Sequence, residues 1–252
     1  MITRYLTILL ALALSACGGG GGGGSTPAAS SAPAQTAEGL WSGTTSTSRT
    51  ITGIVLDTGT YWVLYSSSNN SATIAGVIEG TGTSLNGNFS SSDAKDFNLE
   101  GLGVNNATVS ASYTAKQTLN GSVTYPSLNQ SSTFTSSYNT AYDQTPSLAT
   151  LAGTYTGSAA VIGGSESATV TVSASGAVSG AGASGCQFTG SATPHAHGNV
   201  YDLTITFGGG VCANGTNTVT GIGYFNSATK ALYSAALNST RSNGFIFVGT
   251  KP

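Results

Sequence analysis

The sequence predicts an all-β protein with two small up-and-down β-barrels, or barrel-like sandwiches, in tandem behind a flexible glycine-rich tether. From Glu38 onward, apolar and polar residues alternate over short runs bounded by Gly, Asn, Asp and Pro, which is typical of strands and turns. Glycine makes up 36 of the 252 residues, while charged residues account for only 6%, against roughly 25% in an ordinary domain. This scarcity of charge disfavours long solvent-exposed helices, and no stretch sustains a period of 3.6 residues.

Residues 1–16 have the features of a secretory signal peptide. Arg4 supplies a positive charge, and the apolar run Tyr5–Leu14 that follows is too short to span a bilayer.

The end of this segment, Leu14-Ser15-Ala16-Cys17, resembles a bacterial lipobox. The resemblance implies cleavage before Cys17 and attachment of two or three acyl chains, such as palmitate, to that residue. Two or more chains anchor a protein stably in a membrane. Gly18 lacks the Asp that favours inner-membrane retention in enteric-type bacteria, so the resemblance implies the outer membrane, on either its periplasmic or its surface face. An ordinary cleaved signal peptide is the alternative.

Residues 17–37 are predicted to be a tether. Seven consecutive glycines, Gly18–Gly24, precede a stretch rich in Ser, Thr, Pro and Ala that has no side chain able to build a core. Such a chain holds a folded domain near the bilayer and lets it tumble.

Residues 38–145 are predicted to form the first barrel. Asp57-Thr58-Gly59 has the composition of a hairpin turn between IVL and YWVLY. Eight short strands are expected, at Leu40–Thr44, at the two arms of Ile54–Tyr65, and at Thr73–Glu79, Ser84–Ser90, Thr108–Thr114, Leu119–Tyr125 and Thr133–Tyr138.

Residues 148–252 are predicted to form the second barrel, with the boundary near Pro146, which interrupts the strand pattern. The motif GTYTG at its start repeats the GLWSG that opens the first half. Eight strands are again expected, at Gly153–Gly157, Ala168–Ser173, Ala177–Gly180, Cys186–Ser191, Val200–Phe207, Thr216–Phe225, Ala231–Leu237 and Gly244–Gly249.

Cys186 and Cys212 remain as a pair once Cys17 is assigned to lipidation. Export implies an oxidising compartment, so the pair predicts a disulfide between neighbouring strands. Closing a loop of this length contributes roughly 3 kcal/mol. A redox-active pair is the alternative, but the chain has no Cys-x-x-Cys motif and no base beside either cysteine.

His195 and His197 are the two histidines of the chain. On a strand they would face the same way and could bind a metal, but the nearest carboxylate in sequence is Asp202. Because Pro194 and Gly198 bracket the pair, we predict a turn tip and no metal site.

Aromatic residues gather in the first half, above all Trp41, Tyr61, Trp62 and Tyr65. They are expected to fill a core, and the alternative is that they line a barrel mouth that binds a small ligand. GLWSG resembles the G-x-W opening of lipocalin and avidin-type barrels, which agrees with the second possibility.

Charge and motifs exclude several classes of function. A net charge of -2 with scattered basic residues leaves no nucleic-acid surface. There is no G-x-S-x-G motif, and the closest acidic pair, Asp93 and Asp96, is expected to lie on a solvated loop. We therefore predict no enzyme activity and no cofactor.

The function predicted from the sequence is a non-enzymatic binding or interaction module, anchored in the outer membrane. It would contact a partner through loops and exposed Tyr, Asn and Ser. An acylated Cys17, a polyglycine tether and two β domains also resemble the surface lipoproteins of the transferrin-binding protein B and factor H-binding groups. A carrier of a small apolar ligand and a structural envelope component are the alternatives.

Overall fold

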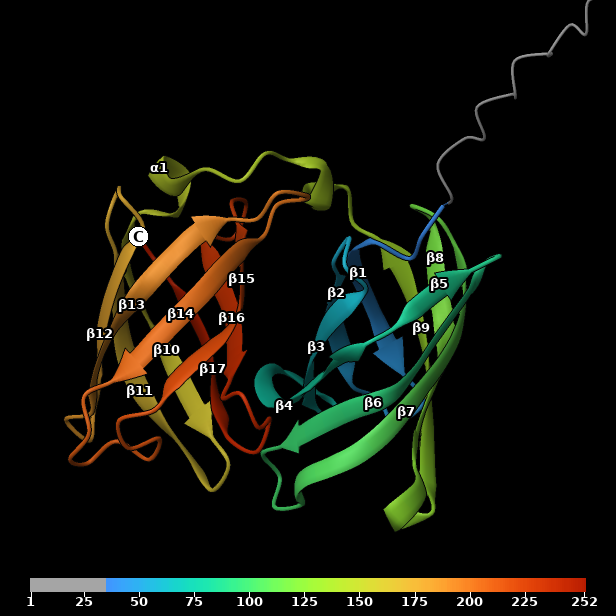
Figure 1. Cartoon of the computed structure of the whole chain (residues 1–252), viewed down its shortest axis with the longest axis horizontal. Coiled ribbons are helices and arrows are strands. Elements are labelled where there is room, and N and C mark those ends of the chain that lie inside the picture. The colour runs from blue at the N-terminus through green and yellow to red at the C-terminus, as the bar shows by residue number, and fades with distance from the viewer. Residues whose placement is uncertain (1–34) are drawn as a thin grey trace, which may run out of the picture. The chain divides into compact units, whose positions relative to one another are not determined.

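The computed structural model describes residues 35–252 (Figure 1). The predicted signal peptide, Cys17 and most of the predicted tether lie outside the described residues. Between residues 35 and 252, no helix is long and apolar enough to cross a membrane. The fold is all-β, as predicted, with two closed antiparallel barrels in tandem.

Barrel 1 has eight wall strands, because β4 pairs with β6 and closes a sheet whose order is β4-β3-β2-β1-β9-β8-β7-β6-β5. The short β5 forms a hairpin with β6 outside this closure, and the 3-10 turn η1 (Pro126–Leu128) joins β8 to β9. The strands are β1 (Gly39–Thr45), β2 (Thr50–Val55), β3 (Thr60–Ser67), β4 (Asn70–Thr81), β5 (Thr83–Leu85), β6 (Asn88–Asn98), β7 (Gly103–Thr114), β8 (Thr118–Tyr125) and β9 (Gln130–Tyr138).

Barrel 2 runs in simple chain order from β10 to β17, and β10 pairs with β17 to close it. The short helices η2 (Thr140–Asp143) and α1 (Leu148–Leu151) join it to barrel 1. Its strands are β10 (Gly153–Val161), β11 (Gly164–Val172), β12 (Ala177–Gly182), β13 (Gln187–Pro194), β14 (Tyr201–Phe207), β15 (Thr218–Asn226), β16 (Ala231–Leu237) and β17 (Gly244–Thr250).

The segment around Asn86-Gly87 differs from the single strand expected at Ser84–Ser90. Both residues have positive φ, 50° and 78°, as a two-residue hairpin turn requires, and the chain reverses there from β5 into β6. Leu85 consequently points to solvent with 66% of its surface exposed, whereas Phe89 is buried.

The expectation of a solvated loop at Asp93 and Asp96 is wrong, because β6 continues through both residues. The stretch SSSDAK lacks the alternation of large apolar residues that marks a strand, since its inward side chains are small or polar. A register shift between Ser91 and Ala94 then exchanges the two faces of the strand, so that Asp96 points inward.

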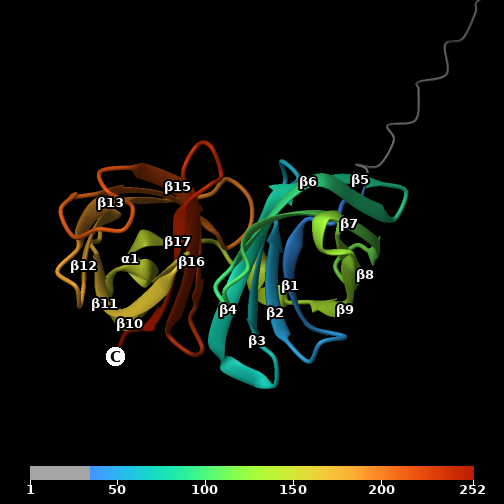
Figure 2. The same cartoon turned by 90° about the horizontal axis from the view of Figure 1, so that it is seen from below.

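The outer face of β2, β3 and β4 is buried as well as the inner face. Ile54, Trp62 and Val77 form one apolar cluster with side chains of β15, β16 and β17, including Tyr224 and Ile246. In Figures 1 and 2 these strands of the two barrels lie side by side. Strands buried on both faces explain why YWVLY is apolar at every position.

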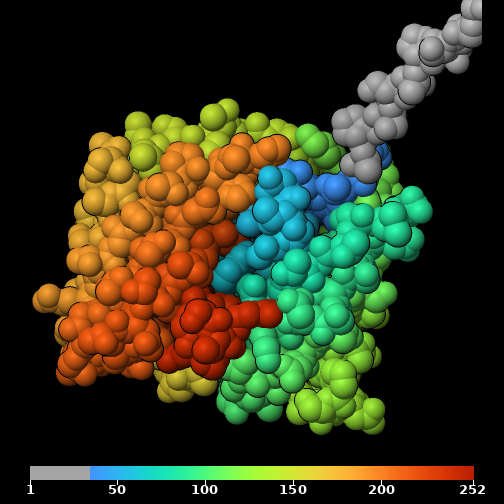
Figure 3. Space-filling view, in the orientation of Figure 1, coloured from blue at the N-terminus to red at the C-terminus, as the bar shows by residue number. Residues whose placement is uncertain are grey.

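Polar contacts flank this apolar cluster. In the β16–β17 loop, Arg241 Nε lies 2.6 Å from Glu79 Oε2, and its Nη1 lies 3.2 Å from Asp93 Oδ2. Arg241 Nη2 also donates to the backbone carbonyls of both acidic residues. Figure 3 shows the red segment of this loop against the teal segment of barrel 1.

Candidate ligand-binding site in barrel 1

Barrel 1 encloses a cavity of about 220 Å³, whereas the interior space of barrel 2 is about 20 Å³. Both barrels have eight wall strands, but different side chains fill their interiors. Phe188, Phe207 and Phe245 pack against one another in the centre of barrel 2, with ring centroids 5.8 to 6.3 Å apart. A cavity of roughly 150 Å³ holds a benzene molecule, so the space in barrel 1 is large enough for a small organic ligand.

The cavity stays open because large rings lie against the barrel wall. Tyr65 and Tyr61 on β3 pair across the sheet with Gly76 and Gly80 on β4. A Cβ atom built at Gly76 would lie 2.2 Å from Tyr65 Oη, and one at Gly80 would lie 2.6 Å from Tyr61 Oη. The two glycines therefore make room for the tyrosine rings beside the wall, and the centre of the barrel remains free.

One end of the cavity opens to solvent and the other is plugged. Thr47, Gln130 and Ser131 line the cavity and are exposed, which places the mouth at the β1–β2 and β8–β9 connections. At the opposite end Ala37 is fully buried, and its carbonyl accepts a hydrogen bond of 2.9 Å from Trp41 Nε1. The chain thus enters barrel 1 at its closed end.

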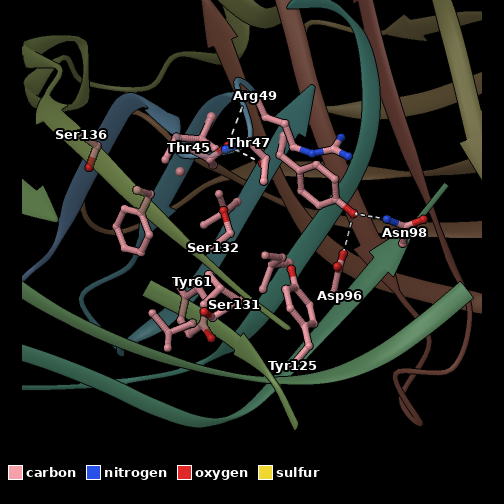
Figure 4. A pocket seen from close by; sticks show the side chains of 18 of the residues that line it. Thr45, Thr47, Arg49, Tyr61, Asp96, Asn98, Tyr125, Ser131, Ser132 and Ser136 are labelled. Carbon is pink, nitrogen blue, oxygen red and sulfur yellow. Dashed lines mark hydrogen bonds between the residues drawn. The ribbon is translucent and has the colours of Figure 1, made fainter. Parts of the chain in front are cut away.

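A buried carboxylate lies on the otherwise mostly apolar wall. Asp96 is 4% exposed, and its Oδ1 accepts a hydrogen bond of 2.7 Å from the Tyr65 hydroxyl (Figure 4). Asn98 Nδ2 donates to the same hydroxyl oxygen at 3.2 Å. Burial raises the pKa of Asp96 to about 6, although hydrogen bonds from Tyr65 and Tyr125 and the charge of Arg49 act in the opposite direction.

Arg49 lies near the mouth and is already paired. Its Nη2 lies 2.6 Å from Glu100 Oε2, and its Nη1 donates to the Ser66 carbonyl at 2.8 Å. The guanidinium also lies over the Tyr65 ring, 5.4 Å from the centroid. This cation therefore closes part of the rim and fixes the ring that contacts Asp96.

Three of the four aromatic residues singled out from the sequence, Trp41, Tyr61 and Tyr65, line the cavity together. Trp62 does not join them, because alternation along β3 turns it outward into the apolar cluster between the barrels, where it is 8% exposed. Alternation along β8 puts Tyr125 on the same face as Leu119 and Val123, and all three line the cavity. Asp96 gave no such signal, because counting by twos from Phe89 would place it outside, and only the register shift in β6 brings it in.

The tyrosines that were expected to be exposed at the surface are not exposed. Every tyrosine between residues 35 and 252 is buried or half-buried, because the rings fill the barrel interiors and the contact between them.

The disulfide between Cys186 and Cys212 is present, with the two Cα atoms 4.6 Å apart. It joins the residue before β13 to the β14–β15 loop, so it belongs to barrel 2. It has no part in the cavity of barrel 1.

His195 and His197 lie in the turn between β13 and β14. His195 Nδ1 lies 2.8 Å from Asp202 Oδ1, and its Nε2 lies 3.1 Å from Asp57 Oδ1 on barrel 1. Desolvation lowers the pKa of His195, but the hydrogen bonds to the two carboxylates outweigh it and leave the pKa above its ordinary value. Within the described residues, no group of three or more His, Cys, Asp and Glu side chains is arranged to hold a metal ion.

Comparisons with known proteins find similarity among solved structures alone. No protein-family model and no curated protein sequence matches the chain. The similar structures include transferrin binding protein B from serogroup B Neisseria meningitidis, at 10% identity and a TM-score of 0.31. They also include intact Ap-TbpB, at 11% and 0.30, and a TbpB mutant from Haemophilus parasuis Hp5, at 12% and 0.30.

Each of these comparisons covers 81% of this chain, and the chain spans 58%, 66% and 66% of the three structures.

Proposed function

We propose that this protein is a non-enzymatic binding protein that holds a small, mostly apolar ligand inside barrel 1. The cavity of about 220 Å³ carries this proposal, because it has a mouth, a plugged floor and walls of aromatic and aliphatic side chains. It favours a small-ligand carrier over an interaction module that recognises its partner through exposed tyrosines.

The titratable groups of the cavity agree with binding rather than catalysis. Burial raises the pKa values of Tyr61, Tyr65 and Tyr125 far above their ordinary range, so the three hydroxyls stay protonated. Arg49 is held by Glu100, and the Asp96 carboxylate accepts from Tyr65. These side chains can orient a ligand through hydrogen bonds without forming a nucleophile–base pair.

A filled-cavity variant tests the proposal. Val123 on β8 lines the cavity, and its neighbour Thr124 is exposed on the same strand. With 2-phenylethanol as the probe, we expect Val123→Phe to weaken binding at least tenfold in isothermal titration calorimetry. Thr124→Phe, which adds the same ring on the outer face, is expected to leave the affinity within twofold. Failure of the wild-type protein to bind any small aromatic probe, together with a ligand-free mass on purification, would contradict the proposal.

The membrane anchor is a further part of the proposal, and it rests on the sequence. Cys17 in the lipobox-like segment would carry the acyl chains and hold the protein at the outer membrane. We expect metabolic labelling with an alkyne palmitate analogue to mark the wild-type protein and not Cys17→Ser. Equal labelling of the two proteins would rule out Cys17 as the acylation site.

Protease treatment of the same cells tests on which face of the outer membrane the protein lies. Protease treatment of intact cells digests a surface-exposed protein, whereas a periplasmic protein is digested only after the outer membrane is permeabilised.

A further inference from the structure

We propose that the ligand of barrel 1 is a small organic amine whose protonated nitrogen binds the Asp96 carboxylate, with its apolar part among the surrounding rings. This inference rests on the proposed function, since it names the chemical class of ligand for the same cavity.

The wall of the cavity carries a buried negative charge. Of the residues between 35 and 252 that line the cavity, Asp96 alone carries a carboxylate, and it is 4% exposed. The Tyr65 hydroxyl donates to Oδ1 and supports the negative charge. A carboxylate in such surroundings is costly unless it is paired, and an ammonium group would supply both the opposite charge and further hydrogen-bond donors.

Aromatic rings line the cavity that contains this carboxylate. Trp41, Tyr61, Tyr65 and Tyr125 line the same cavity, together with Phe89 and Phe134. Faces of aromatic rings attract cations, most strongly where water is excluded. The same rings can bury the hydrocarbon part of an amine, so the wall of the cavity contacts both the charged nitrogen and the apolar part of the ligand.

Arg49 is the group that could bind an anionic ligand instead, but it is already paired. Two of the guanidinium nitrogens are occupied by Glu100 and by the Ser66 carbonyl. An anion would share this cation with Glu100, whose Oε2 already lies 2.6 Å from Nη2. Arg49 and Asp96 are the charged residues that line the cavity, and Arg49 is paired with Glu100 outside the lining, so the charge left for a ligand is that of Asp96.

A matched set of three probes separates the alternatives. They are 2-phenylethylamine (a cation), 2-phenylethanol (neutral) and phenylacetate (an anion), and all carry one phenyl ring. At pH 7.5 we expect the amine to bind at least tenfold more tightly than the alcohol, and phenylacetate to bind more weakly than both.

Asp96→Asn is expected to remove the preference for the amine, so that the amine and the alcohol bind this variant with affinities within twofold of each other. Asp143→Asn is the control, because it removes an exposed carboxylate that pairs with Lys116 outside the cavity. The preference for the amine should also fade as the pH falls below about 6, where Asp96 takes up a proton.

Each outcome bears on one level of the argument. Equal binding of the amine and the alcohol, or an amine preference that survives in Asp96→Asn, overturns this inference and leaves the proposed function standing. Tightest binding of phenylacetate overturns it in favour of Arg49. Binding of none of the three probes overturns this inference, and together with a ligand-free mass on purification it overturns the proposed function as well.

Discussion

Asp96 affects both the stability of barrel 1 and its candidate site. Its carboxyl sits on a wall of rings, where burial moves its pKa from the ordinary 3.8 to about 6. A carboxyl group with a raised pKa stabilises the folded state while it is protonated. That contribution is present below pH 3.8 and is lost as the pH rises through the folded pKa of about 6. A shift of this size corresponds to about 3 kcal/mol.

We therefore expect Asp96→Asn, which has no charge to bury, to be more stable than the wild-type protein above pH 7, by up to about 3 kcal/mol. The difference should shrink as the pH falls from 6 to 4. Urea unfolding at a series of pH values measures this directly. A constant difference across the pH range would show that the ionisation of Asp96 is not its source.

The disulfide is the second feature at the scale of residues. Replacing Cys186 and Cys212 together by Ala is expected to lower the stability of barrel 2 by about 3 kcal/mol, because the unfolded chain regains the freedom of a 26-residue loop. Urea unfolding measures the loss of stability, and amide hydrogen exchange in β13 and β14 shows whether the loss lies in barrel 2. An unchanged exchange rate in these strands would contradict the expectation.

At the scale of elements, the pairing of β3 with β4 creates the cavity. Tyr65 faces Gly76 across the two strands, and the missing side chain lets the ring lie against the wall. A shift of one residue in this register would turn both tyrosines outward and close the space.

Gly76→Ala should therefore displace the Tyr65 ring and break its hydrogen bond to Asp96. The new Cβ would lie 2.2 Å from Tyr65 Oη and 2.5 Å from the Phe97 carbonyl oxygen. We expect a loss of about 2 kcal/mol in urea unfolding, in the range of overpacked cores. Gly164→Ala is the control, because nothing lies within 4 Å of its added Cβ. Similar stability of the two variants would contradict this account of the cavity.

At the scale of the whole molecule, the two barrels are joined by an apolar cluster with charged residues around it. Glu79 is 8% exposed, and burial raises its pKa although the charge of Arg241 acts against the shift. Arg241 has a φ of 51°, a conformation that Asn tolerates better than most residues.

Arg241→Asn should therefore leave the loop in place and leave Glu79 without its cation. We expect a loss of about 2 kcal/mol at pH 7, less than for a fully buried pair because Arg241 keeps 26% of its side chain exposed. The loss should shrink at pH 4, where Glu79 is more readily protonated. Lys230→Asn is the control, because it removes an exposed cation at a residue with a similar positive φ of 55°. Equal unfolding midpoints for the two variants would show that Arg241 does not stabilise the contact.

The sequence alone predicted the all-β class, the two barrels, most of their strands and the disulfide. These features follow from local patterns, because alternation with a period of two and glycine-bounded turns specify strands without reference to the rest of the chain. The inward positions of Trp41, Tyr61 and Tyr65 follow from the same alternation.

The tertiary structure decided the features that depend on contacts between residues far apart in the chain. The register shift in β6 brings Asp96 to Tyr65, the pairing with Gly76 keeps the cavity open, and the apolar face of barrel 2 buries Trp62. Alternation says that a strand has two faces, but which face points inward after a bulge is set by the neighbouring strands. The candidate site in barrel 1 therefore emerged only when distant strands were brought together.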